Sequence, residues 1–351
     1  MLAMITALCA AAALLLLLLR FAAPLGLLDE PDARKVHAHA TPLIGGLAWI
    51  GGTLIAALIF SDAPQQAGLL SALCAMALLG ALDDRFHLPS IPRLIIQVVI
   101  VACVTQFDGV LLVDLGSIFG TEQLHLREFS WAFTVFALVG VINAMNMIDG
   151  VDGLSGSLAL LILATLSILS WQSNFALALL LAMSAAALLP FLALNLRLPW
   201  RSRASVFLGD AGSMALGLLI GYSMVVLSQG KDAAFPPSAA LWLFAVPLID
   251  TVSVMLRRLA QRKSPFQPDQ QHVHHLLLRA GFSVTHVVLL LFVAQAVCLG
   301  FGVLGPSLGI PDYLQVLIFV TVGLCYHGLV GRALRSGRLL GRVLLAQLQR
   351  A

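Results

Sequence analysis

Charged side chains are scarce in this sequence, and their scarcity excludes most classes of soluble protein. Of its 351 residues only 11% are Asp, Glu, Lys or Arg, whereas 60% are hydrophobic. Soluble domains carry roughly 25% charged residues. The composition therefore indicates an integral membrane protein, and nothing in it favours a nucleic-acid partner.

Cysteine is also sparse, and its spacing excludes a disulfide framework or a CxxC redox site. The cysteines stand singly inside apolar runs, at Cys9, Cys74, Cys103, Cys298 and Cys325. The sequence lacks an HExxH zinc motif, a repeat, a linker and a shift in composition, so we expect a single domain over residues 1–351. The first apolar stretch has no cationic region before it and no Ala-x-Ala site after it, which predicts a retained first span.

About eleven apolar segments are long enough to cross a bilayer, and they lack the alternation typical of β-barrel strands. They lie at about residues 2–22, 43–60, 67–82, 91–107, 129–147, 154–172, 175–195, 207–228, 239–256, 284–304 and 313–331. The expected fold is an all-α polytopic membrane protein, a bundle of about eleven transmembrane helices. Its glycine pairs, Gly45-Gly46 and Gly51-Gly52, favour close helix packing.

Cationic residues predict the orientation of this bundle. Except for Arg127 and Lys231, every Lys and Arg falls in the loops and tail on one side of the predicted spans. By the positive-inside rule that side is cytoplasmic, the N-terminus is periplasmic and the C-terminus is cytoplasmic. The polar clusters described next all fall on the cytoplasmic side, which predicts one site facing the cytoplasm.

The most polar stretch runs from Asn143 to Ser157 and interrupts two long apolar runs. Asn143, Asn146, Asp149 and Asp152 recur every third residue, which places them on one face wherever the chain is helical. Carboxylate and amide oxygens suit a hard cation such as Mg²⁺, which binds few protein oxygens together with substrate phosphates. The alternative is a polar loop that caps two helices.

Two further acidic clusters lie on the same side. Asp83 and Asp84 end an apolar span, where the helix dipole disfavours negative charge, so they require a metal or a cationic partner. Asp210 stands between glycines at the start of another span, where backbone amides could hold a phosphate and the carboxylate a cation. The alternatives are exposed loop acids beside Arg85 and a simple N-cap.

Basic groups complete the candidate site. His272, His274 and His275 follow Arg257 and Arg258, a concentrated set of donors for phosphate and ribose. Lys35 belongs to a second cationic cluster near the membrane. Both clusters could instead bind anionic lipid headgroups.

Asn195 and Asp250 are polar residues in apolar surroundings, which makes them functional candidates. A pairing of Asp250 with Arg257 or Arg258 would explain that aspartate structurally. Together these groups suit Mg²⁺-dependent transfer of a phosphate-bearing group to or from a lipid.

Five motifs in this order resemble the polyprenyl-phosphate N-acetylhexosamine-1-phosphate transferases. The matching residues are 29–37, 83–85, 143–153, 209–213 and 268–275, and the resemblance covers about residues 29–282. It implies transfer of N-acetylglucosamine-1-phosphate from UDP-N-acetylglucosamine to undecaprenyl phosphate, with release of UMP. That reaction would be the first lipid-linked step of a cell-surface polysaccharide, at the bacterial inner membrane.

The resemblance also implies roles for individual residues. Asp83 and Asp84 match an acidic pair that activates the lipid phosphate and assists the metal, and Asp149 and Asp152 match further catalytic acids. Asn146 and Asp210 match positions that approach Mg²⁺, for which Mn²⁺ is an alternative.

On the substrate side, Lys35 matches a phosphate-contacting lysine, and the histidine loop with Arg257 and Arg258 matches the nucleotide-sugar side. We count Asn143 and Asn195 among the substrate-binding residues. One departure is His87, which stands where the family often has a third aspartate.

Other readings stay open. A relative could use a different UDP-N-acetylhexosamine, either a deoxy amino sugar or the muramoyl-pentapeptide donor, although Pro268-Asp269 and the histidines after them resemble the amino-sugar type more. A membrane transporter would also bury polar groups, but it would favour mid-membrane sites and an inverted repeat. Expected partners are the UDP-sugar, undecaprenyl phosphate and membrane lipid, and a homodimer is left open.

Overall fold

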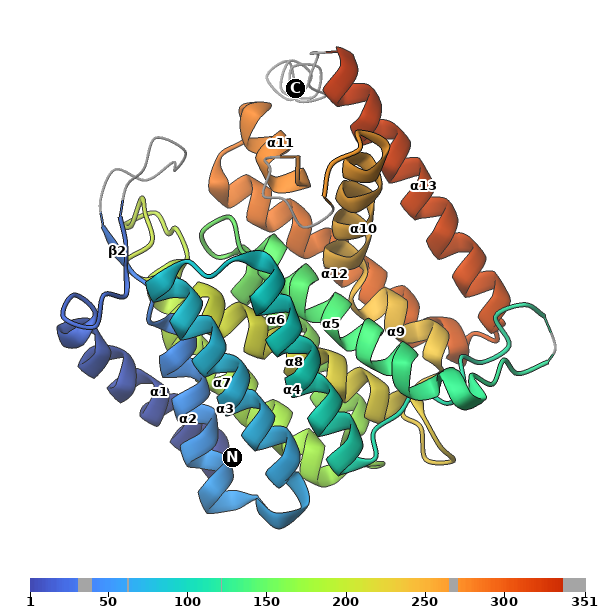
Figure 1. Ribbon diagram of the computed structural model, residues 1–351, viewed down its shortest axis with the longest axis horizontal. Coiled ribbons are helices and arrows are strands. Elements are labelled where there is room, and N and C mark those ends of the chain that lie inside the picture. The colour runs from blue at the N-terminus through green and yellow to red at the C-terminus, as the bar shows by residue number, and fades with distance from the viewer. Residues whose placement is uncertain (31–39, 62, 121, 265–270, 337–351) are drawn as a thin grey trace. The chain divides into compact units, whose positions relative to one another are not determined.

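The computed structural model describes residues 1–30, 40–61, 63–120, 122–264 and 271–336 (Figure 1). Regular structure in these ranges is helical apart from a two-stranded ribbon of β1 (Leu28–Asp29) and β2 (Thr41–Pro42). A short 3-10 helix, Arg127–Phe129, precedes α5. The α-helices are α1 (Leu2–Phe21), α2 (Gly45–Phe60), α3 (Ala63–Phe86), α4 (Ser90–Asp108), α5 (Ser130–Ile148), α6 (Leu154–Ser170), α7 (Phe175–Asn195), α8 (Gly209–Ser228), α9 (Pro237–Leu243), α10 (Ala245–Ala260), α11 (Val273–Arg279), α12 (Val284–Ser307) and α13 (Asp312–Ser336).

The helices confirm an all-α, multi-span membrane protein. Within the described ranges eight helices are long and apolar enough to cross a membrane, or nine spans if α9 and α10, bent by 83°, count as one. Helices α2 and α6 are apolar but shorter. Each of the eleven predicted segments thus corresponds to a helix or to the bent pair, although length and composition support only eight or nine spans.

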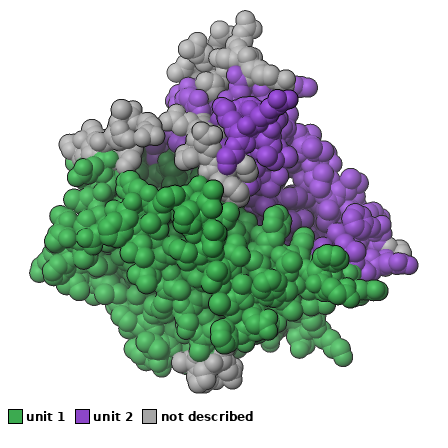
Figure 2. Space-filling model, in the orientation of Figure 1, with its two compact units in different colours: residues 1–114, 125–235 green, residues 115–124, 236–351 purple. Residues whose placement is uncertain are grey.

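The chain forms two compact units, distinguished in Figure 2. Unit 1 comprises residues 1–114 and 125–235, and unit 2 comprises residues 115–124 and 236–351. The sequence-based expectation of a single transferase domain over residues 1–351 stays a prediction.

Helix α8 is the centre of unit 1. It packs against α2, α3, α5 and α6, and all of its residues except Asp210 and Val226 are buried. Helices α3, α4 and α5 run side by side next to it (Figure 1). A helix that is apolar on every side, as α8 is, is typical of the core of a bundle or of a membrane span.

Glycines allow the first turn of α8 to touch its neighbours backbone to backbone. A Cβ atom on Gly46 of α2 would lie 2.2 Å from the Gly212 Cα atom, and one on Gly80 of α3 would lie 2.3 Å from the Ala211 nitrogen. Gly52 similarly admits Ala11 of α1. The expectation that the α2 glycines serve close packing is confirmed.

Backbone hydrogen bonds also fix the start of α8. The amides of Gly45 and Gly46, at the first turn of α2, donate to the carbonyls of Phe207 and Leu208 at 2.9 and 2.8 Å. The Phe207 amide in turn donates to the Pro42 carbonyl beside the ribbon. The unpaired amides of one helix start thereby hold the segment that leads into another.

Unit 2 has its own apolar core. The Trp242 ring of α9 lies 4.5 Å from the Phe301 ring of α12 and 5.3 Å from the Phe319 ring of α13, measured between ring centroids. Ala245 of α10 completes this cluster. All five cysteines of the chain are free, as their spacing predicts.

The contact at Gly46 predicts a stability effect. Gly46→Ala should destabilise the protein by roughly 1–3 kcal/mol, because a methyl group there must displace the backbone of α8. A lower midpoint of heat denaturation in detergent would show it. Gly140→Ala is the matched control, since nothing lies within 4 Å of a Cβ atom at Gly140 of α5. Equal midpoints for both variants would contradict the close contact.

Candidate active site

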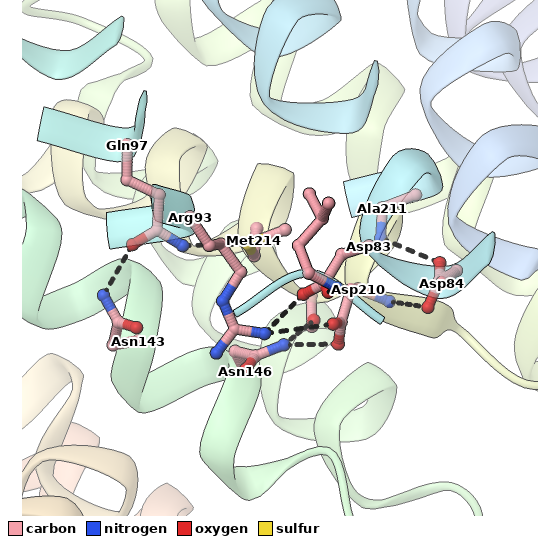
Figure 3. A network of polar contacts seen from close by, with 11 residues as sticks. Asp83, Asp84, Arg93, Gln97, Asn143, Asn146, Asp210, Ala211 and Met214 are labelled. Carbon is pink, nitrogen blue, oxygen red and sulfur yellow. Dashed lines mark hydrogen bonds and ion pairs between the residues drawn. The ribbon is translucent and has the colours of Figure 1, made fainter. Parts of the chain in front are cut away.

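Three helix ends in unit 1 bring acidic and amide side chains together (Figure 3). Asp83 and Asp84 lie in the last turn of α3, Asn146 lies near the end of α5, and Asp210 lies in the first turn of α8. The expectation that these residues face one another from separate motifs agrees with this geometry. Their catalytic and metal-binding roles stay predictions.

Arg93, in the first turn of α4, is the cation of this network. Its guanidinium forms an ion pair with Asp83 and lies 3.4 Å from the Asp210 carboxylate. Asp83 also accepts a hydrogen bond from the Leu88 amide at 2.8 Å. The cationic partner that Asp83 required is therefore Arg93, which sequence reasoning had counted only as a cytoplasmic charge.

Asp84 binds the start of α8. Its two carboxylate oxygens accept hydrogen bonds from the amides of Asp210, at 2.9 Å, and of Ala211, at 3.3 Å. An anion at a helix N-terminus is stabilised by unpaired amides and the helix dipole. We expected these amides to be offered to a phosphate; in the structure they are engaged by Asp84.

Amide side chains extend the network down the helices. Asn146 donates to Asp210 at 2.7 Å and to the Ser213 hydroxyl at 3.0 Å. One turn earlier in α5, the Asn143 side chain donates to the side-chain oxygen Oε1 of Gln97 at 2.8 Å. Gln97 is a fully buried residue of α4. Gln97 lies four residues after Arg93, so α4 presents both on one face. Neither residue belongs to a motif recognised in the sequence.

Asp149 follows α5 directly and adjoins the network. Its carboxylate accepts a hydrogen bond from the Ser155 hydroxyl at 2.5 Å and interacts electrostatically with Asp84. Burial raises the pKa of Asp149 to about 6, and the Asp152 carboxylate adds to that rise, whereas the Ser155 hydrogen bond opposes it. Asp149 is therefore a carboxyl group that titrates close to neutral pH.

Asp152 and Asn195 hold loops together. Asp152 forms an ion pair with Arg197 at 2.7 Å and accepts from the Ala204 amide at 3.3 Å. Asn195 accepts from the Gly153 amide at 2.6 Å and donates to the Val206 carbonyl at 2.7 Å. These bonds join the turn after α5 to the loop between α7 and α8. Both residues therefore support the turn that follows Asp149.

The histidine segment lies in unit 2 and is held by Asp250 of α10. Asp250 accepts hydrogen bonds from His272 Nδ1 at 2.8 Å, from the Val273 amide at 3.0 Å and from the Tyr326 hydroxyl at 2.5 Å. Its pairing with Arg257 or Arg258, which the sequence left open, is thus replaced by pairing with His272. Three donors converge on this buried carboxylate, so its charge is compensated where it stands.

Arg257, Arg258 and His274 are buried in the same unit. Arg257 donates to the Ser253 hydroxyl at 2.6 Å and to the Gln271 carbonyl at 2.9 Å. The His274 ring stacks with His272 at 5.6 Å between centroids and lies 4.2 Å from the His275 ring. Burial, with a smaller contribution from the neighbouring His275, lowers the pKa of His274 to about 3. His274 is therefore neutral near pH 7 and can offer hydrogen bonds but no charge to a phosphate.

Two sequence-level candidates need separate mention. Lys35 lies outside the described residues, as do Pro268 and Asp269. His87, which replaces a third aspartate, ends α3 with a φ of 52° and is exposed.

Among the residues that the structure describes, no three His, Cys, Asp or Glu side chains gather closely enough to hold a metal by themselves. The oxygen donors of the acidic network nonetheless suit Mg²⁺, which commonly takes only one or two protein carboxylates and completes its shell with phosphates and water. Three carboxyl groups lie there. Arg93 contacts those of Asp83 and Asp210, whereas the backbone amides at the start of α8 hold that of Asp84. Such a cluster of acidic groups suits a divalent cation.

The sequence of this chain is similar to those of known transferases. Residues 66–228, which contain the whole acidic network, match glycosyl transferase family 4. An undecaprenyl-phosphate alpha-N-acetylglucosaminyl 1-phosphate transferase of Escherichia coli O157:H7 is 34% identical over 92% of this chain and 89% of its own length. Proteins of the same name from Yersinia pestis and Pasteurella multocida are each 36% identical, over 92% and 94% of this chain and 89% and 93% of their own lengths.

The similarity extends over about nine-tenths of both chains, so it is not confined to one segment of this protein. The acidic network and the buried helix α8 lie within the residues that match the family, 66–228. The chain belongs to glycosyl transferase family 4.

Proposed function

We propose that this protein transfers N-acetylglucosamine-1-phosphate from UDP-N-acetylglucosamine to undecaprenyl phosphate, giving undecaprenyl-diphospho-N-acetylglucosamine and UMP. The observation that carries the proposal is the similarity to transferases of that name along most of the chain. The acidic network of α3, α4, α5 and α8 supports it, because carboxylates, amides and a guanidinium are the groups that phosphoryl transfer requires.

In the reaction we propose, an oxygen of the lipid phosphate attacks the β-phosphorus of the UDP-sugar. The new oxygen–phosphorus bond forms as the bond to the bridging oxygen breaks, and UMP leaves with that oxygen. A phosphate monoester has a second pKa near 6, so the lipid phosphate needs little help to lose its proton. Asp83 or Asp84 would accept any proton that remains, and no covalent enzyme intermediate is required.

Arg93 is the residue best suited to orient the attacking phosphate. A guanidinium binds phosphate oxygens in pairs, and Arg93 already bridges the carboxylates of Asp83 and Asp210. A phosphate that shares this guanidinium would stand beside both carboxylates. Asn146, bonded to Asp210, would keep that aspartate in place.

We propose that Asp210 and the Asn146 carbonyl oxygen hold Mg²⁺, or Mn²⁺ in its place. When bound, the cation would neutralise charge on the transferred phosphoryl group. The side-chain nitrogen of Asn146 donates to Asp210 and Ser213, which leaves the side-chain oxygen, Oδ1, to bind a cation.

For the donor we propose Arg257, Arg258, His272, His274 and His275, together with Asn143 and Lys35. The neutral His274 ring supports a contact with an uncharged group, since its buried Nδ1 atom has no hydrogen-bond partner among the described residues. The arginines supply the charge that diphosphate needs. Asp149 and Asp152 stay proposed catalytic acids, and Asn195 a proposed substrate-binding residue.

We further propose that residues 1–351 work as one transferase domain in the bacterial inner membrane. The distribution of Lys and Arg supports eleven spans with a periplasmic N-terminus and a site open to the cytoplasm. A donor with another amino sugar remains the main alternative, because epimers differ by single hydrogen bonds. A homodimer is compatible with this proposal but is not needed for it.

A direct assay tests the proposed reaction. Purified protein, undecaprenyl phosphate and Mg²⁺ should release UMP from UDP-N-acetylglucosamine, and EDTA should stop that release because the phosphate charge is then not neutralised. UMP release from a different UDP-sugar only would support the same reaction with another donor. Absence of UMP with every UDP-sugar would contradict the proposal and favour a transporter.

The acidic network predicts the effect of two substitutions. Asp83→Asn and Asp210→Asn should each lower UMP release by about 10²-fold or more, since each removes a charge aimed at the reacting phosphates. Asp232→Asn, in an exposed loop, is the control. The amount of each variant in the membrane fraction should equal that of the wild type. Activity near the wild-type rate in either network variant would remove that residue from the mechanism.

Asp149 predicts a pH dependence. If its carboxylate form is needed, the rate should fall as the pH drops below about 6, where this group becomes protonated. Ser155→Ala removes a hydrogen bond that lowers this pKa, so the acid limb should move up by about one unit, the size expected for a bond to a charged group. The substitution does not change the pKa of the lipid phosphate, so a shift of the acid limb reports on Asp149.

The measurement is the pH profile of the rate at saturating substrates. Ser157→Ala, two residues along α6, is the control and should leave the profile unchanged. A Ser155→Ala profile that overlays the wild-type profile would show that ionisation of Asp149 does not limit the reaction.

A further inference from the structure

Helix α13 of unit 2 is linked to two of the candidate donor-binding side chains, His272 and Arg257, through one intermediate residue each. Tyr326 and His327 are neighbours in α13, and their partners, Asp250 and Ser253, lie one turn apart on α10. Asp250 holds His272, and Ser253 holds Arg257. Two adjacent residues of one helix thus support two parallel chains of hydrogen bonds.

The first chain sets the position and the tautomer of His272. The Tyr326 hydroxyl and the Val273 amide both donate to Asp250 Oδ1, while His272 Nδ1 lies 2.8 Å from Oδ2. Because an ionised carboxylate only accepts, Nδ1 of His272 carries the proton, and Nε2 remains for a ligand. Val273 begins α11, so the same carboxylate anchors the start of the helix that carries His274 and His275.

The second chain orients Arg257. Its guanidinium donates to the Ser253 hydroxyl at 2.6 Å, and that hydroxyl lies 3.0 Å from His327 Nδ1. The Ser253 oxygen accepts from the arginine and keeps a second lone pair and its own hydrogen, so it can pair with His327 Nδ1 in either tautomer of the ring. A second bond, to the Gln271 carbonyl, ties the same guanidinium to the segment just before His272.

We propose that Tyr326 and His327 are positioning residues, which hold His272 and Arg257 in the arrangement that binds the nucleotide-sugar donor. The inference rests on the donor role proposed for those two residues. Neither Tyr326 nor His327 lies in a sequence motif, and much of the apolar surface of α13 is exposed, including Leu317, Leu324 and Leu329. A helix at the edge of unit 2 would then determine the affinity of the donor site.

The test is the kinetics of UMP release by full-length protein. Tyr326→Phe removes only the hydroxyl and should raise the KM for UDP-N-acetylglucosamine about three- to tenfold, the effect of one hydrogen bond. The kcat and the KM for undecaprenyl phosphate should change little. Tyr313→Phe, the same substitution at an exposed position of the same helix, is the matched control.

Double substitutions show whether each residue acts through its assigned partner. In a His272→Ala background Tyr326→Phe should have no further effect on the donor KM, since the group that it positions is gone. His327→Leu should likewise raise the donor KM in the wild type and have no effect in Arg257→Ala. His327→Asn should restore most of the affinity, because its side-chain oxygen can accept from Ser253.

Each alternative result has one meaning. Equal donor KM values for Tyr326→Phe and Tyr313→Phe, additive effects in the double variants, or no rescue by His327→Asn would overturn the positioning role while the reaction stands. A wild-type protein that releases no UMP from any UDP-sugar would overturn the proposed function and the inference with it.

Discussion

The bond between the Asp84 carboxylate and the first amides of α8 is the interaction on which the acidic network depends. It joins the end of α3 to the start of the central helix, and glycines at Gly46 and Gly80 let the backbones meet there. Asp210 stands in that same first turn. The packing that stabilises the core of unit 1 and the position of a proposed metal ligand therefore have one origin, a backbone contact that tolerates no side chain.

Two charges of the network run against the helix dipoles. Asp83 lies at the C-terminal end of α3 and Arg93 at the N-terminal end of α4, each where its charge is disfavoured. Their ion pair compensates both, but Asp210 has to share the same guanidinium, and Asp84 has only backbone amides as partners. Such an arrangement is costly for a structural element alone, since buried charges need full compensation. It is understandable if phosphates and a divalent cation complete it.

Much of this could be predicted from the sequence, and the limits have physical reasons. Apolar length predicts the helices well, because the bilayer fixes it. The bend between α9 and α10 was not visible, since the apolar run continues across it from residue 239 to residue 249. Acidic motifs predicted Asp83, Asp84, Asn146 and Asp210 because carboxylates are rare in apolar chains. Arg93 and Gln97 were missed because their meaning lies in partners on other helices.

The same limit applies to Asp250, whose isolated position in an apolar helix marked it as functional without naming its partner. Sequence proximity left Arg257 and Arg258 open as partners, but three donors from elsewhere reach the carboxylate: His272, Val273 and Tyr326. Together they satisfy both oxygens of this buried group, two on Oδ1 and one on Oδ2. Helix α13 therefore contributes to the proposed donor site through a hydrogen bond to Asp250. Such a bond forms only when separate helices pack together, so the sequence pattern of one helix does not predict it.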